Sequence, residues 1–117
     1  MKQETIKGIL IDPINQEVKW VEFPNKLEGY YRLLDCELID RVAFDDYNDL
    51  IVDDEGLYKG HDTFFSIDGL EGHYVGKSVI VGVDFKEGEW IDAVISEDKL
   101  KVHFYKMKQD DTTESAD

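Results

Sequence analysis

Carboxylates gather around one short apolar run, and they are the residues of this sequence with the most direct chemical potential. The run 50–52 leads into Asp53, Asp54 and Glu55, and Gly56 follows. Carboxylate oxygens are ligands for divalent cations, but the spacing here departs from that of an EF-hand loop. Adjacent strand residues also point to opposite faces, so at most Asp53 and Glu55 share one side. We therefore interpret the segment mainly as an acidic strand end and turn, and we expect no metal site.

Further acids precede the same run, which makes residues 45–55 strongly acidic. A strip of carboxylates at phosphate-like spacing would attract a basic nucleic-acid-binding groove. The sequence thus favours a non-enzymatic protein that mimics nucleic acid and binds a basic partner protein through one continuous acidic face. The residues of this predicted face are Asp45, Asp46, Asp49, Asp53, Asp54 and Glu55.

Aromatic residues provide an alternative site, although such residues more often belong to a core. Aromatic side chains can stack on the ring of a base-containing small molecule. Glycines interrupt any periodicity in the segment 58–77, so we expect an irregular loop there, and this loop could cover such a pocket. The alternative functions are therefore the binding or sequestration of a nucleotide-type signal, or a simple soluble domain with no site of this kind. The residues of the alternative pocket are Tyr30, Tyr31, Phe64, Phe65 and Tyr74.

Residues typical of catalytic centres are not arranged in known patterns. The three histidines lack metal-ligand spacing, and Cys36, the single cysteine, has no histidine nearby in the sequence. The segment 72–78 resembles a phosphate-binding P-loop, but only three residues separate its glycines and it leads into a strand rather than a helix. We expect no enzymatic activity, no catalytic residue and no cofactor.

The composition excludes several classes of protein. The chain has 117 residues and 42% hydrophobic content, enough for one domain with a sizeable core. Its 27 acidic and 13 basic residues give a formal net charge of −14, which repels phosphate backbones and anionic membranes. No run approaches the roughly 18 apolar residues that a membrane span requires. We expect a soluble, cytoplasmic protein without direct nucleic-acid or membrane binding. The sequence does not decide whether the protein forms a homo-oligomer.

Strands that position these residues are predicted from apolar runs and turn residues. Residues 5–11 and 18–23 are rich in strand formers and predict an antiparallel pair. Residues 37–44 and 49–53 flank a polar turn and predict a second hairpin. Residues 78–83 are almost continuously apolar and β-branched, which is typical of a central strand.

Two helices complete the prediction. Apolar residues recur at helical spacing from Leu27 to Leu34, which predicts a helix near residues 25–35. Gly29 weakens this helix and indicates close backbone packing on the sheet. Residues 90–108 fit both helical spacing and a strand, and we favour a C-terminal helix.

The predicted fold class is α+β, with a mainly antiparallel sheet in a single domain. This domain covers residues 1–108, and residues 109–117 are predicted to be a disordered acidic tail because they lack apolar anchors.

Several segments recur together in a known family. In chain order they are Ile6–Pro13, Tyr30–Cys36, Ile39–Val42, Ile51–Leu57 and Tyr74–Gly76. Together they resemble a family of small, uncharacterised proteins of phages, prophages and plasmids, a domain of unknown function whose core motif joins a strand to acidic residues and Glu-Gly. The resemblance covers residues 5–83 and supplies no catalytic residue. It implies an α+β domain and a mobile-element setting, in which the acidic face would bind a host or phage protein and counter host defence.

Overall fold

Nine strands and one α-helix make up the part of the chain that the computed structural model describes, residues 3–56 and 59–107. The α-helix α1 spans Leu27–Leu34, and a short 3-10 helix, η2, spans Glu97–Lys99. The strands are β1 (Thr5–Asp12), β2 (Glu17–Pro24), β3 (Ile39–Ala43), β4 (Asn48–Asp53), β5 (Thr63–Ile67), β6 (Leu70–Val75), β7 (Ser78–Asp84), β8 (Glu89–Ile91) and β9 (Val102–Lys106).

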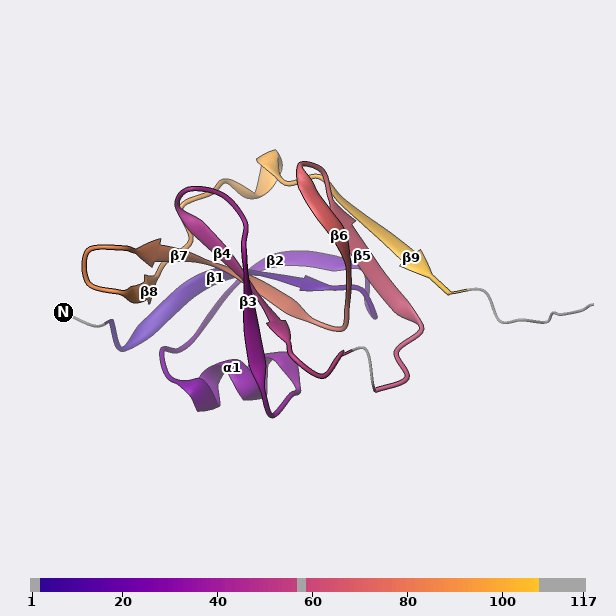
Figure 1. Ribbon diagram of the computed structural model, residues 1–117, viewed down its shortest axis with the longest axis horizontal. Coiled ribbons are helices and arrows are strands. Elements are labelled where there is room, and N and C mark those ends of the chain that lie inside the picture. The colour runs from indigo at the N-terminus through magenta and orange to yellow at the C-terminus, as the bar shows by residue number, and fades with distance from the viewer. Residues whose placement is uncertain (1–2, 57–58, 108–117) are drawn as a thin grey trace, which may run out of the picture.

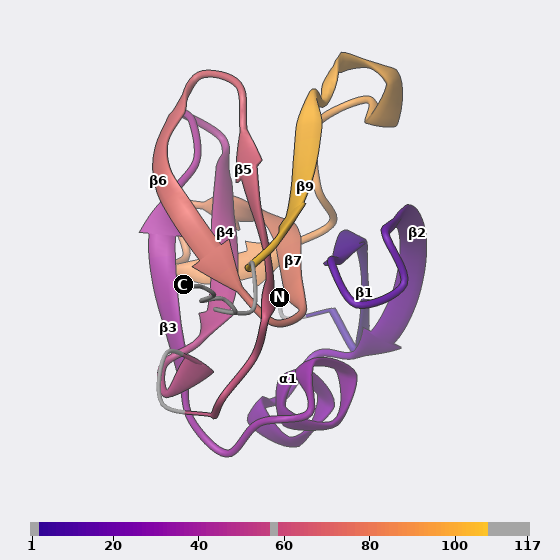
Figure 2. The same cartoon turned by 90° about the vertical axis from the view of Figure 1, so that its right-hand side faces the viewer.

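The strands form two antiparallel sheets. The large sheet has the order β2-β1-β7-β4-β3, with β8 also paired to β7, and the small sheet has the order β6-β5-β9. Figures 1 and 2 show α1 at the bottom of both views and the turn of the β5–β6 hairpin at the top. The molecule thus has three layers, with the large sheet in the middle. The predicted central strand is confirmed as β7.

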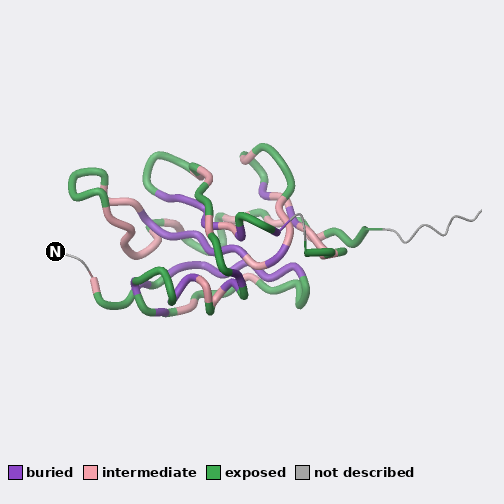
Figure 3. The backbone as a smooth tube through the Cα atoms, turned by 60° about the horizontal axis from the view of Figure 1, so that its bottom comes forward, coloured by how far each residue is buried: buried purple, intermediate pink, exposed green. Residues whose placement is uncertain are grey.

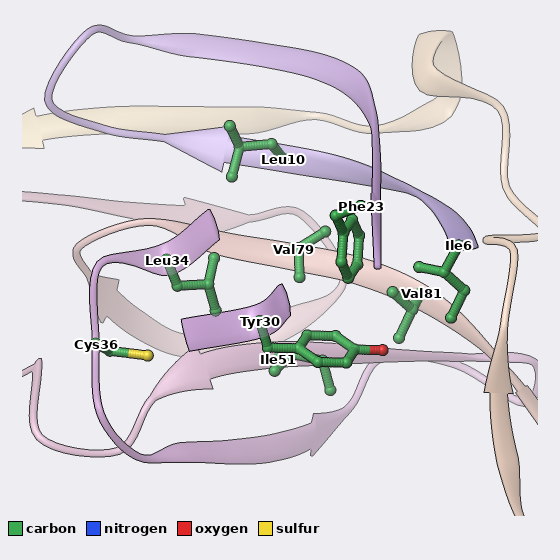
Figure 4. Close-up of a cluster of buried hydrophobic side chains, with 9 residues drawn as sticks. All are labelled: Ile6, Leu10, Phe23, Tyr30, Leu34, Cys36, Ile51, Val79 and Val81. Carbon is green, nitrogen blue, oxygen red and sulfur yellow. The ribbon is translucent and has the colours of Figure 1, made fainter. Parts of the chain in front are cut away.

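Side-chain alternation along the large sheet divides the core into two clusters. In β1, Leu10 packs under α1, whereas Ile9 and Ile11 face the small sheet. A strand that is buried on both faces reads as a continuous apolar run, as residues 78–83 do. Figure 3 shows the buried residues along the middle of the molecule and the exposed ones in the outer turns. The helix-side cluster, drawn in Figure 4, contains Ile6, Leu10, Phe23, Tyr30, Leu34, Cys36, Ile51, Val79 and Val81.

The predicted fold class, α+β with a C-terminal helix, is wrong. The described residues form a small domain of mainly antiparallel sheet rather than an α+β fold with a C-terminal helix. Val102 and Phe104 are half-buried while His103 and Tyr105 are exposed, and this period of two matches the pairing of β9 with β5. The helical spacing across residues 90–108 arose because it spanned β8, η2 and β9, which are separate elements.

The segment 58–77 is also more regular than predicted, because most of it forms the β5–β6 hairpin. Gly69, with a φ of 89°, forms the tight turn between the strands, where a positive φ favours glycine. Gly72, with a φ of 101°, lies where the pairing register shifts. The helix near residues 25–35 and the two predicted hairpins are confirmed. Leu57, Tyr58 and the predicted tail lie outside the described residues.

The helix α1 is short and covers only part of the large sheet. Its eight residues are about 12 Å long. Close packing at Gly29 is confirmed, because a Cβ atom there would lie 2.0 Å from the carbonyl oxygen of Pro24 at the end of β2. In residues 3–56 and 59–107, no helix is both long and apolar enough to cross a membrane. At the N-terminal end of α1, the helix-side face of the large sheet is left open between the β3–β4 and β7–β8 hairpins.

Candidate functional site

A pocket of about 640 Å³ occupies this open part of the sheet. Small-molecule sites usually measure roughly 300–1,000 Å³. Its walls come from the start of α1, from the β3–β4 hairpin and from the β7–β8 hairpin. We call it the Trp90 pocket, and its main polar and aromatic wall residues are Tyr30, Arg41, Asp49, Phe85, Glu89 and Trp90.

Asp49 organises one wall of the Trp90 pocket. This residue is only 3% exposed. Nη1 of Arg41 donates to both Asp49 carboxylate oxygens, at 3.2 and 3.3 Å, and Nε1 of Trp90 donates to Oδ2 at 3.1 Å. The Arg41 side chain itself is 60% exposed. One buried carboxylate therefore fixes a solvent-facing guanidinium and an indole side by side.

The β3–β4 hairpin brings the two charged partners together. Its register pairs Arg41 with Ile51 and Ala43 with Asp49, so Arg41 and Asp49 are diagonal neighbours on one face. The carboxylate of Asp45 accepts a hydrogen bond from the backbone N–H of Tyr47 at 2.8 Å, which stabilises the connecting turn. The turn thus sets the register that pairs the arginine with the carboxylate.

The β7–β8 hairpin positions the indole. Trp90 pairs with Val83 across the hairpin. Just beyond β8, the chain approaches β7 so closely that a Cβ atom on Gly82 would lie 2.2 Å from the carbonyl oxygen of Asp92. The Trp90 ring contacts the edge of the Tyr30 ring, with a centroid separation of 5.0 Å. Trp90 is therefore held by packing on one side and by Asp49 on the other.

Tyr30, which lines the same pocket, also carries a buried polar atom. The residue is 1% exposed, and its hydroxyl has no hydrogen-bond partner among the described residues. Burial raises the pKa of Tyr30 well above its ordinary value, so the hydroxyl stays neutral. Figure 4 shows this hydroxyl at the Val81 end of the cluster. An unpartnered buried hydroxyl costs about 1–3 kcal/mol of stability, so a tyrosine rather than a phenylalanine at this position calls for an explanation.

The predicted acidic residues are not all on the surface. Asp53, like Asp49, is buried, and its Oδ2 lies 2.7 Å from Nζ of Lys59. Asp53 Oδ1 accepts the backbone N–H of Glu55 at 2.9 Å, and the hydrogen bond from Lys59 raises the pKa of that lysine. Asp53 therefore ties the chain after β4 to the strand end.

The remaining predicted acids lie at opposite ends of β4, two before the strand and two after it. The expectation of one continuous acidic face is therefore wrong, because its central members are buried and paired. Binding of a basic partner protein stays a prediction that rests on the four exposed carboxylates, Asp45, Asp46, Asp54 and Glu55.

The aromatic residues of the alternative pocket are distributed between two sides of the large sheet. Tyr30 lines the Trp90 pocket, and Tyr31 borders a separate depression at the other end of α1. Phe65 and Tyr74 pack in the second core cluster, between the two sheets, and Phe64 lies on the opposite face of β5. The five residues do not converge, and the β5–β6 hairpin belongs to the layer on the other side of the large sheet from the Trp90 pocket.

Sequence reasoning missed Arg41 and Trp90 as site residues. The hairpin that carries Arg41 was predicted, and its register alone indicates that Arg41 and Asp49 share a face. Trp90 was hidden because residues 90–108 were assigned to a helix. No pattern in the sequence brings residue 90 close to residues 30 and 49.

Cys36 is buried under α1 and has a protonated thiol. Burial, with a smaller contribution from the Asp53 carboxylate, raises the pKa of Cys36 from its ordinary value of 9.0 to about 11. About 100-fold less thiolate is therefore present at pH 8 than in the unfolded chain, and we expect labelling with a disulfide reagent to be slowed at least as much. Equal labelling rates with and without denaturant would contradict the burial.

The raised pKa of Cys36 also predicts a pH dependence of stability. Because the native state keeps this proton to higher pH than the unfolded chain does, the free energy of unfolding should fall between about pH 9 and 11.

Comparison with known proteins gives one matching family. The family described as Domain of unknown function (DUF3846) matches residues 6–105. Over 97 residues the chain is 32% identical to the "Uncharacterized protein y4iR" of Sinorhizobium fredii (strain NBRC 101917 / NGR234), an alignment that covers 81% of this chain. The chain spans only 60% of the length of that relative. No solved structure matches significantly. The expected kinship with uncharacterised proteins is confirmed, and the chain belongs to the DUF3846 family, a domain of unknown function.

Proposed function

We propose that this protein binds a small aromatic molecule in the Trp90 pocket and sequesters it without chemical conversion. The observation that carries the proposal is the buried carboxylate of Asp49, which holds Arg41 and Trp90 together at the pocket wall. A planar guanidinium offers several N–H donors in a fixed fork, and only Nη1 is used by Asp49. The remaining donors can bind acceptor atoms of a ligand.

Aromatic and apolar side chains complete the binding surface. Trp90 is half-buried, and Phe85, also in the wall, is 71% exposed. Leu27 at the start of α1 is 56% exposed. Exposed apolar residues around a concave site favour burial of a flat ring, while a few fixed polar groups set its orientation. A binding site of this kind fits the phage or plasmid setting that the sequence resemblance implies, and that setting is part of the proposal.

The hydroxyl of Tyr30 gives the proposal a separate support. Less than 1 Å² of this atom contacts water, so a ligand that reaches it must displace a neighbouring side chain. Phenylalanine would fill the same space without an unpartnered hydroxyl. Retaining tyrosine there has a cost in stability that a ligand hydrogen bond would offset.

The Tyr30→Phe variant is expected to separate stability from binding. Removal of the unpartnered hydroxyl should raise the free energy of unfolding by about 1 kcal/mol, while the affinity for the ligand falls about fivefold or more. Urea denaturation and a ligand titration measure the two effects. Tyr31→Phe is the matched control because Tyr31 does not line the pocket. A fall in stability with unchanged affinity would contradict the role of the hydroxyl.

A thermal-shift panel tests the proposed function itself. The panel contains purine and pyrimidine bases, nucleosides, nucleotides and aromatic amino acids. A ligand at 100 times its dissociation constant stabilises the folded state by about 2.7 kcal/mol. At least one aromatic compound is expected to raise the melting temperature of the wild-type protein and to have a smaller effect on Tyr30→Phe. Absence of any shift across the panel would overturn the proposal.

A further inference from the structure

The charges of the Trp90 pocket cancel one another. Its walls contain two cations, Lys26 and Arg41, and two carboxylates, Asp49 and Glu89. Nη1 of Arg41 contacts the Asp49 carboxylate at 3.2 Å. Nζ of Lys26 lies 3.8 Å from a carboxylate oxygen of Glu28. Each cation is therefore already close to an acid, and the pocket holds no excess positive charge for a phosphate.

The rest of the chain adds to this selection against anions. Its formal net charge is −14. A field of this sign lowers the local concentration of anionic ligands and leaves uncharged ones unaffected. Neighbouring charges within about 8–10 Å contribute most at physiological ionic strength. Glu89 lies in the pocket wall and forms no salt bridge among the described residues, so its charge contributes directly to this repulsion.

The polar groups that remain are suited to the edge of a neutral heteroaromatic ring. The free N–H groups of Arg41 can donate hydrogen bonds to a ring edge, and the neutral hydroxyl of Tyr30 can donate or accept one once a neighbouring side chain has moved aside. Nucleobases carry donors and acceptors along one edge, and they are recognised by such groups together with stacking on aromatic side chains. Trp90 and Phe85 supply the aromatic surface.

We infer that the ligand of the Trp90 pocket is an uncharged nucleobase or nucleoside rather than a phosphorylated nucleotide. This inference rests on the proposed function and names its ligand class. Arg41 binds the ring edge, and Trp90 with Phe85 contacts the ring face. Glu89 opposes any phosphate that the ligand carries.

Paired titrations test the inference with defined probes. Adenosine, guanosine, cytidine and uridine are each compared with their 5′-monophosphates by calorimetry, at 20 mM and 500 mM sodium chloride, together with the free bases. At low salt the tightest nucleoside is expected to bind about tenfold more tightly than its monophosphate, and the ratio should shrink at high salt. If free bases bind as tightly as nucleosides, the pocket recognises the ring alone. If free bases bind more weakly than nucleosides, the pocket also contacts the ribose. Both results support an uncharged ligand.

A variant of Glu89 makes the charge argument specific. In Glu89→Gln, the preference for the nucleoside over its monophosphate should narrow about threefold or more. Glu87→Gln removes the same charge from the same hairpin outside the pocket wall, and should leave the ratio nearly unchanged. Tighter binding of monophosphates by the wild-type protein would overturn the inference while the proposed function stands. Binding of only aromatic amino acids in the thermal-shift panel would also overturn it, whereas absence of all binding removes the proposed function.

Discussion

Replacement of Asp49 by asparagine is expected to lower the free energy of unfolding by about 2 kcal/mol and to weaken ligand binding at least tenfold. The carboxylate accepts hydrogen bonds from a guanidinium and an indole at once. An amide cannot accept from both partners with the same strength, and its NH2 group faces the donors of Arg41. The indole N–H or the amide is then left without a full partner, and Arg41 is no longer fixed.

Asp46→Asn is the matched control for this variant. It removes the same charge from an exposed position in the same hairpin, and surface changes of this kind usually stay within about 0.5 kcal/mol. Urea denaturation measures stability, and ligand titration measures affinity. If Asp49→Asn and Asp46→Asn behave alike in both assays, Asp49 does not organise the pocket.

Replacement of Gly29 by alanine is expected to lower the free energy of unfolding, whereas a glycine-to-alanine change in a helix usually raises it. In an open helix, alanine stabilises by about 1 kcal/mol relative to glycine. Here the new Cβ atom would lie 2.0 Å from a backbone oxygen of Pro24, so α1 must move away from β2. Overpacking typically costs about 1–3 kcal/mol, and we expect the upper end because a backbone atom cannot rotate away.

The same movement would displace Tyr30, which follows Gly29 directly and lines the pocket. Gly29→Ala is therefore expected to lower both stability and ligand affinity. Glu28→Ala is the control, since Glu28 is exposed on the same helix and its replacement should cost less than about 1 kcal/mol. A stabilised Gly29→Ala protein would show that α1 is not packed as described.

Five strands of the large sheet, all but β8, could be predicted from sequence because each has a local pattern. The β1–β2 and β3–β4 hairpins follow from apolar runs separated by turn residues, and β7 follows from a run that is apolar on both faces. The helix α1 follows from its apolar stripe. These features need only neighbouring residues, which is why they were found correctly.

The small sheet and the C-terminal segment were predicted wrongly because tertiary pairing decides them. The residues Val102–Lys106 fit both periods, and only β5, about forty residues earlier in the chain, selects the strand. Glycines at residues 69 and 72 looked like breaks in regular structure, although they form a turn and a register shift. Propensity alone does not distinguish these cases.

Two residues of the Trp90 pocket, Asp49 and Tyr30, were predicted as site residues, but in roles that differ from those in the structure. Asp49 was singled out as a surface charge, whereas it is buried and fixes two pocket residues. Tyr30 was grouped with aromatic residues that lie elsewhere. The pocket exists because α1 is short and leaves part of a sheet uncovered, and this depends on three elements that are far apart in sequence.

Fluorescence of Trp90 is the measurement that tests the central claim most directly. Trp20 is on β2, away from the Trp90 pocket, so Trp20→Phe leaves Trp90 as the one tryptophan of the chain. Titration with a nucleoside is expected to change Trp90 emission saturably, and the change should be lost or shifted at least tenfold in the Asp49→Asn background. Calorimetric binding that leaves Trp90 emission unchanged, or that is unaffected by Asp49→Asn, would contradict ligand binding in this pocket.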